Sequence, residues 1–384
     1  MADSKITSPA TIALVNVNDS PAQTWNYLRI NDIAFDVPAP QAGRTGAAFN
    51  RLPKLFSAIE DGLGAEATRW IERMADGAAY VEVPARTRRD EPVVVAVTDG
   101  EPFKDTGVMV REGASVRIIV STSSRQEATS TVATTAAALR VIAERGAEVE
   151  IVQIVASGEG RQHLEAIGVE AADDARVSIR QYALGGAKVA LGIAANLAGK
   201  SSRIDLTCRY VAGGSELLDI NHVVRMRGRD TRSEIQSTGI LGDSARKTMR
   251  ETIDLIHGAK GAKGNEAETV LVTGDGVTNK TLPSILCDEE DVQGNHGATI
   301  GSLSPEQIDY LKARGLSEDD IDTLFSRALF DDALNHAEVA SARTAVIARG
   351  THVLGDAFED EALSFSPAEA AGDAEDNTDA SSNE

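Results

Sequence analysis

Short runs rich in β-branched residues follow one another through the middle of the chain, from Val93–Val97 to Ser284–Cys287. Gly, Asp, Asn and Ser positions separate these runs, which is typical of strands joined by turns. Residues 175–180, Ala-Arg-Val-Ser-Ile-Arg, alternate apolar and polar side chains with the period of a sheet that has one buried face. We therefore predict a long, mainly β region.

Composition narrows the choice of β architecture. Hydrophobic residues make up 42% of the chain, aromatic residues only 4%, and there are 33 glycines, so small and β-branched side chains must fill much of the core. A solenoid whose turns stack such side chains suits this composition. No repeat of fixed length is visible, so a sandwich or a barrel stays open on pattern alone.

Helical patterns precede and interrupt the β-rich runs. Residues 1–90 form a mixed region with helix-like apolar spacing at 52–59 and an amphipathic run at 66–74. The Ala-rich segment 130–144 predicts one helix inside the β region.

After residue 303 the sequence predicts helices in place of strands. Ser304-Pro305-Glu306-Gln307 provides an N-cap, a proline in the first turn and the Gln of a capping box. Ser317 begins a second predicted helix, and Ile321, Leu324 and Phe325 share one face of it. An Ala-rich third helix is predicted over residues 332–349.

The formal charge of −21 argues against nucleic acid as a partner, because nonspecific affinity for a phosphate backbone comes from Lys and Arg. Residues 356–384 contain ten acidic and no basic residues, so this tail carries about half of the excess charge. Its composition predicts disorder.

Two cysteines, Cys208 and Cys287, are too few for a disulfide framework and match no zinc-binding spacing. We expect Cys208 to be a buried strand thiol. The first residues lack the pattern of a signal peptide, and no stretch approaches 18 apolar residues. We therefore expect a cytoplasmic protein that does not contact a membrane.

The densest group of reactive side chains is Cys287, the acidic run Asp288–Asp291, and His296. Iron accepts thiolate, carboxylate and imidazole ligands, so these residues are candidate metal ligands. The alternative is a solvated acidic turn beside a buried Cys and a core His. The chain has no GxxxxGK[ST] motif, so any ATP hydrolysis must occur on another protein.

Residues 282–325 resemble the C-terminal core of the SufB/SufD family of the SUF iron–sulfur cluster assembly system. The resemblance rests on Asp291-Val292, the tetrapeptide His296-Gly297-Ala298-Thr299, Gly301, and the pattern from Tyr310-Leu311 to Arg314-Gly315. It implies a right-handed parallel β-helix with N-terminal and C-terminal α-helical regions. It also implies a complex of SufB, SufC and SufD.

Departures from the SufB pattern make the chain resemble the SufD branch of the family. Gly297 stands where SufB has a Glu after the histidine, and residues 265–273 contain no cysteine. Gly294 occupies a position where other SufD sequences have a cysteine. The resemblance implies a non-catalytic subunit that holds no cofactor stably on its own, with His296 at the SufB interface where iron or a nascent cluster is handled. Cys287 is a candidate metal ligand because of its position in the sequence, and the family resemblance does not imply this role.

The resemblance assigns the region after residue 303 to docking the SufC ATPase, and the expected contacts are Tyr310, Leu311, Ile321, Leu324 and Phe325. In isolation the chain is expected to be able to form a homodimer. We expect four regions: a mixed and helical region at 1–90, a β-helix at 91–303, docking helices at 304–355 and the tail at 356–384.

Three alternatives remain at this point, and one of them is a plain interaction scaffold in which His296 has no part in cluster assembly. A SufB-like scaffold would hold the cluster itself. A β-helix carbohydrate-active enzyme would need paired carboxylates in an open groove, and most such enzymes act outside the cell, which the missing signal peptide does not favour.

Overall fold

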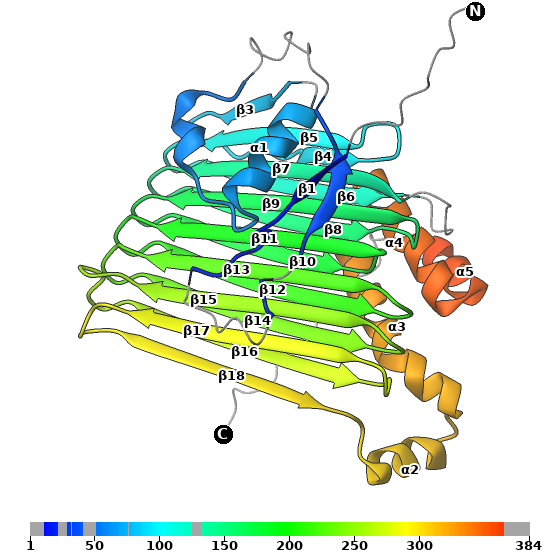
Figure 1. The fold of residues 1–384 in the computed structure, drawn as a ribbon. Coiled ribbons are helices and arrows are strands. Elements are labelled where there is room, and N and C mark those ends of the chain that lie inside the picture. Colours follow the sequence, from blue (N-terminus) through cyan, green and yellow to red (C-terminus); the bar gives the residue numbers. More distant parts are fainter. Residues whose placement is uncertain are drawn as a thin grey trace, which may run out of the picture.

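The computed structural model describes residues 11–21, 29–31, 33–40, 51–75, 77–124 and 132–364. Its body is a parallel β-solenoid in which the chain alternates between two eight-stranded sheets (Figure 1). The odd-numbered sheet consists of β3 (Ala79–Val83), β5 (Phe103–Val110), β7 (Ala133–Ala143), β9 (Arg161–Ala171), β11 (Lys188–Leu197), β13 (Leu217–Met226), β15 (Arg246–Leu255) and β17 (Thr278–Cys287). The even-numbered sheet consists of β4 (Val93–Val97), β6 (Ser115–Ser123), β8 (Glu148–Ala156), β10 (Arg176–Ala183), β12 (Arg203–Ala212), β14 (Arg232–Leu241), β16 (Lys263–Val272) and β18 (Gln293–Gly301).

The register of the sheets stacks like side chains on one another. Val149 of β8 pairs with Val177 of β10, and Val177 pairs with Ile204 of β12, so each turn adds a branched side chain to the same inner column. This confirms the predicted parallel β-helix and decides against a sandwich or a barrel. The turns differ in length by a few residues, which explains why no fixed repeat is visible in the sequence.

The N-terminal segments cover the outer face of the odd-numbered sheet. The antiparallel pair β1 (Thr11–Leu14) and β2 (Phe35–Pro38), the 3-10 helix η3 (Lys54–Ala58) and helix α1 (Ala65–Met74) lie over it (Figure 1). Trp70 and Ile71 of α1 pack there against small side chains of the sheet.

The helix predicted over residues 130–144 is wrong, because residues 133–143 form β7. Leu139 and Val141 point into the solenoid core, while Ala136 and Ala138 lie beneath the N-terminal segments. The strand is buried on both faces, and the N-terminal segments pack directly on the small side chains of Ala136 and Ala138. Alanine therefore serves packing here, and its helix propensity is overridden.

Up to residue 364, where the described part of the chain ends, four helices follow the solenoid: α2 (Pro305–Ala313), α3 (Glu318–His336), α4 (Ala340–Leu354) and α5 (Asp356–Ser364). Ser304 and Ser317 both form complete capping boxes. The single helix predicted over 332–349 is wrong, because the chain turns at 337–339 between α3 and α4. Helix α5 lies in the range predicted to be disordered; residues 365–384 lie outside the described residues.

The last helices pack on the even-numbered sheet. Phe330, Val346 and Phe358 join Ile154 and Tyr182 of the sheet in one apolar cluster. Among the described residues, no helix is long and apolar enough to cross a membrane.

Candidate functional site

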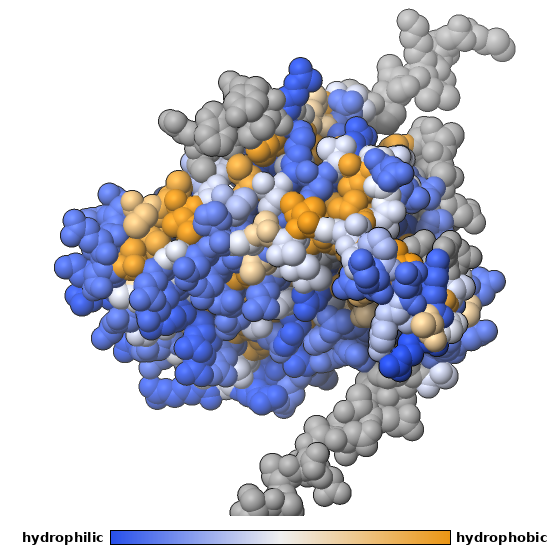
Figure 2. Space-filling model, turned by 90° about the horizontal axis from the view of Figure 1, so that it is seen from below, coloured by the Kyte–Doolittle hydropathy of each residue, from blue (hydrophilic) through white to orange (hydrophobic). Residues whose placement is uncertain are grey.

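One end of the solenoid presents two strands that are paired on one side only. In the part of the chain that the structure describes, β17 pairs only with β15, and β18 pairs only with β16. Every residue of β18 is exposed. Figure 2 views the molecule from this end, where hydrophobic areas interrupt a mostly hydrophilic surface. Unpaired strand edges are templates for pairing with another chain.

His296 lies on β18 with its side chain on the inward face of the turn. Its register partner is Glu266, which is buried inside the solenoid, and partners in a parallel ladder point to the same face. A Cβ on Gly294, two residues earlier, would meet Ile285 at 3.1 Å and Leu255 at 3.3 Å, which also places this face inward. His296 therefore stands at the mouth of the solenoid interior.

Cys287 occupies the last position of β17 and is exposed, unlike the buried thiol of the alternative interpretation. Its Sγ lies 3.2 Å from the backbone oxygen of Glu289. The acidic turn is ordered by Glu289, whose carboxylate accepts a hydrogen bond from Gly258 N at 2.8 Å, and this bond lowers the pKa of Glu289.

The structure does not gather these residues into a ligand set. Gly294 lies against Ile285, so His296 stands farther back along β17 than Cys287, which ends that strand. Within the described ranges, no group of three His, Cys, Asp or Glu side chains has the geometry of a metal site. A site at this end would need ligands from a second protein.

A chain of buried polar side chains runs through the solenoid interior toward this end. All of its members are almost fully buried, which is costly for charged groups unless they are paired. The hydrogen bonds join Thr135 to His163 (2.9 Å), His163 to Glu165 (2.8 Å), Glu165 to Gln153 (2.6 Å), Gln153 to Gln181 (2.7 Å), Gln181 to His222 (2.9 Å) and His222 to Glu251 (3.0 Å).

His222 lies between an amide and a carboxylate in this chain of hydrogen bonds. Gln153 Nε2 donates to Glu165, and Gln181 Nε2 donates to Gln153, so the Gln181 carbonyl faces His222 Nε2. The Glu251 carboxylate faces Nδ1. His222 therefore has an oxygen within hydrogen-bond distance of each ring nitrogen, and these two contacts fix the orientation of its ring.

Glu251 and Glu266 are neighbouring carboxyl groups at the end of this chain. Burial and, to a smaller extent, the adjacent Glu251 carboxylate together raise the pKa of Glu266 to about 10. Burial also acts to raise the pKa of Glu251, but hydrogen bonds from His222 and Ser237 outweigh it and the pKa is lowered. The pair therefore holds one proton on Glu266 near neutral pH.

A second buried cluster lies beside the first. Lys247 Nζ pairs with the Glu268 carboxylate, which also accepts from Tyr210 at 2.7 Å and from Thr281 at 2.7 Å. Burial lowers the pKa of Lys247, and Glu268 opposes that shift. Cys208 lies nearby, and burial raises the pKa of its thiol, as expected for the predicted strand thiol.

The residues predicted to dock a partner lie on α2 and the first half of α3. Tyr310, Leu324 and Phe325 are exposed, Leu311 is half-buried, and Ile321 is buried at 3% exposure. Among the described side chains, α2 buries none. The predicted stripe thus presents four of its five residues to solvent at least in part.

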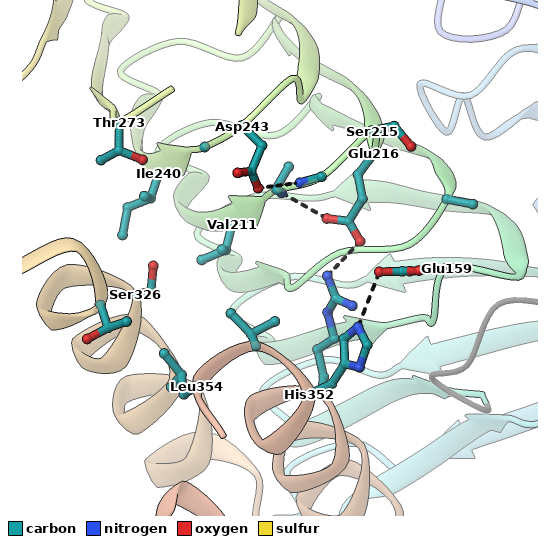
Figure 3. Close-up of a pocket in the computed structure, with 18 residues that line it drawn as sticks. Glu159, Val211, Ser215, Glu216, Ile240, Asp243, Thr273, Ser326, His352 and Leu354 are labelled. Carbon is teal, nitrogen blue, oxygen red and sulfur yellow. Dashed lines mark hydrogen bonds and ion pairs between the residues drawn. The ribbon is translucent and has the colours of Figure 1, made fainter. Parts of the chain in front are cut away.

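A cleft of about 750 Å³ separates α3 and α4 from the solenoid turns (Figure 3). Its walls include Val211 and Ile240 from the sheet and Ser326 from α3. Arg349 of α4 fixes one side: it donates to Glu216 at 2.6 Å and to Leu184 O at 2.7 Å. The helices are therefore anchored through α4.

Reasoning from the sequence missed the polar interior entirely. Glu266 and Glu268 alternate with small and apolar residues and so read as the exposed face of a strand. Only the register of the turns shows that this face points inward. A sequence repeat of fixed length would have revealed that register.

Comparisons with known proteins identify relatives of this chain. A family model described as the SUF system FeS cluster assembly SufBD core domain matches residues 95–329. The chain is 21% identical over 257 residues to the iron–sulfur cluster assembly protein SufD of Escherichia coli (strain K12), covering 65% of this chain and 60% of that protein. It is 27% identical over 221 residues to a SufBD family protein of Mycobacterium leprae, covering 56% of each.

A third relative is the SufD protein of Bacillus subtilis, which is 23% identical over 152 residues, or 40% of this chain and 35% of that protein. The matched part of the chain thus spans about a third to three fifths of the length of these relatives.

Proposed function

From the match over residues 95–329, which shows that the chain belongs to the SufBD core family of the SUF system, we propose a SufD-like role in iron–sulfur cluster assembly. In this role the chain is a cytoplasmic, non-catalytic subunit. It pairs with a SufB-like subunit, binds a SufC-like ATPase, and supports iron delivery and cluster formation.

The single observation that carries the pairing is the unpaired edge of β17 and β18 with His296 at its mouth. A second solenoid with a similar edge can add its strands there through main-chain hydrogen bonds. Such pairing brings the partner's side chains to His296, which lacks companions for a metal site within the described part of this chain. Iron or a nascent cluster is then held between the two subunits.

Docking of the ATPase is supported by the exposed apolar side chains of α2 and α3. Tyr310 is 57% exposed and Phe325 is 38% exposed, on helices that extend from the anchored α4. An amphipathic helix pair of this kind fits an apolar groove on a partner. Movement of the ATPase would then reach the solenoid through α3 and α4.

Phe325→Asp tests the docking site, with Leu363→Asp as the matched control. Leu363 is 66% exposed and lies on α5, away from α2. A tagged SufC-like ATPase should copurify with the native chain and with the Leu363→Asp control. It should recover much less of the Phe325→Asp variant. Equal recovery of both variants would place the ATPase elsewhere.

Anaerobic reconstitution separates the SufD-like role from that of a cluster-holding scaffold. The isolated chain should retain no stoichiometric cluster after desalting, whereas the pair with a SufB-like subunit should. A stable cluster on this chain alone would support the SufB-like alternative, for which the exposed Cys287 is the available thiolate.

A further inference from the structure

Arginine side chains gather on the outer face of the even-numbered sheet, although the chain as a whole carries a formal charge of −21. They line a groove of about 470 Å³ over the first halves of β6, β8, β10 and β12. We call this the arginine groove, and its arginines are Arg88, Arg89, Arg117, Arg176, Arg180 and Arg203.

The groove has more guanidinium groups than carboxylates. Its six arginines face four acidic residues, Asp90, Glu148, Glu150 and Asp205. Arg176 and Arg203 are register partners on neighbouring strands, so like charges stand side by side there, and of the two, Arg176 contacts a carboxylate, that of Glu148, at 3.4 Å. Arg180 Nε is 3.7 Å from Glu150, too far for a hydrogen bond, and has no acceptor among the described atoms.

A carboxylate from the helical region already contacts one arginine of this groove. Glu338, in the turn between α3 and α4, pairs with Arg117, which also contacts Glu150 at 2.8 Å. The groove thus accepts acidic side chains from outside the sheet. Guanidinium groups suit this because they bind carboxylates through two parallel hydrogen bonds.

The end of α5 lies beside the same turn. Arg343, in the first turn of α4, donates to Ala362 O at 2.7 Å, so the last turn of α5 returns to the start of α4. The described chain therefore ends near the start of α4, which directly follows the turn that holds Glu338.

The segment that follows has the matching charge. Residues 365–384 contain six acidic and no basic residues. Extended, 20 residues span roughly 65 Å, which exceeds the width of four or five neighbouring strands at about 5 Å each.

We propose that residues 365–384 bind in the arginine groove of the same molecule. The acidic side chains add acceptors to a groove in which the lining arginines outnumber the lining carboxylates by six to four. The contact weakens as salt is added, because its charges are near the surface.

A photocrosslinker in the full chain tests this directly. Benzoylphenylalanine at Thr378 is irradiated, and crosslinked peptides are identified by mass spectrometry. Most crosslinks should join the tail to peptides of β6, β8 and β10 within one molecule, and their yield should fall severalfold in high salt.

Two variants of the full chain decide whether the arginines are responsible. Arg89→Ser/Arg176→Ser/Arg203→Ser should lower the crosslink yield severalfold. The matched control Arg229→Ser/Arg246→Ser, which changes exposed arginines outside the groove, should not. Circular dichroism confirms that each variant is folded.

Crosslinks spread over other surfaces would overturn the proposal, as would a yield that the groove variant leaves unchanged. Crosslinks formed only between two molecules would also overturn it and assign the groove to a second copy of the chain. These outcomes do not depend on whether the chain takes part in cluster assembly, so the two proposals can fail separately.

Discussion

Lys247 and Glu268 form an ion pair in the solenoid interior, where the side chains of both are fully buried. Tyr210 and Thr281 donate further hydrogen bonds to the same carboxylate. Removing one partner of such a pair leaves an uncompensated charge in the core. The polar interior is therefore a point at which single substitutions have large effects.

Lys247→Met should lower the free energy of unfolding by about 3–5 kcal/mol, measured by urea denaturation. The double variant Lys247→Met/Glu268→Gln should lose less, because no charge is then left unpaired. Arg88→Met is the control: it removes one partner of the Arg88–Asp90 pair, whose side chains are 83% and 89% exposed, and should change stability little. A small loss in Lys247→Met would contradict the buried pair.

The raised pKa of Glu266 makes the stability of the folded protein depend on pH. Its pKa is raised from 4.5 to about 10 on folding, so the folded state binds one more proton between these values. Stability therefore falls as pH rises across this window, by about 1.4 kcal/mol per pH unit from this group.

Glu266→Gln should remove that slope in urea denaturation measured from roughly pH 6 to pH 9. Glu234→Gln, on the outward face of β14, should keep it. An unchanged slope in Glu266→Gln would mean that Glu266 is ionised in the folded protein.

At the scale of elements, local signals were sufficient for helix starts and insufficient for β7 and α5. Ser304 and Ser317 form their capping boxes with residues three positions away, so the sequence carries the whole interaction. The Ala-rich β7 is a strand only because other segments cover both of its faces. Helix α5 is ordered by Phe358, which packs on α4 from within an acidic segment.

For the candidate site, too, only features that are local in the sequence were predictable. His296 and Cys287 stand out in a short segment, and the structure places both at the open end of the solenoid. Their separation, and the polar chain from Thr135 to Glu251, depend on the register between turns. Register comes from long-range pairing, which a single sequence without a fixed repeat does not encode visibly.

Phe358→Ala should loosen α5 from α4. Phe358 contacts the Phe330 ring at a centroid distance of 5.8 Å and lies over Gly350, so its removal leaves a cavity. Loss of a buried Phe costs about 3–5 kcal/mol, and here the effect should stay local.

Hydrogen exchange should therefore accelerate in α4 and α5 but not in β8 or β10. Leu363→Ala, on the same helix at an exposed position, should leave exchange unchanged. Unchanged exchange in Phe358→Ala would show that α5 does not depend on the Phe358 contact.

At the scale of the whole molecule, the solenoid separates three surfaces on one rigid core. Strands β17 and β18, each paired on one side only, lie at one end, and helix α2 projects beside them (Figure 1). The arginine groove lies on the outer face of the even-numbered sheet. Since the two sheets share one apolar core, displacement of the anchored helices acts on the body that also carries His296. This arrangement suits a subunit that links an ATPase to an assembly interface.

The most direct test is whether the open end joins a SufB-like subunit. Ile300 is 54% exposed on β18, and Val94 is 47% exposed on β4 near the opposite end of the solenoid, so the two positions form a matched pair. Light scattering after size-exclusion chromatography gives the mass of the mixture with the SufB-like subunit. We expect a heterodimer with the native chain and with Val94→Lys, and separate subunits with Ile300→Lys. A heterodimer that survives Ile300→Lys but is lost in Val94→Lys would contradict the account.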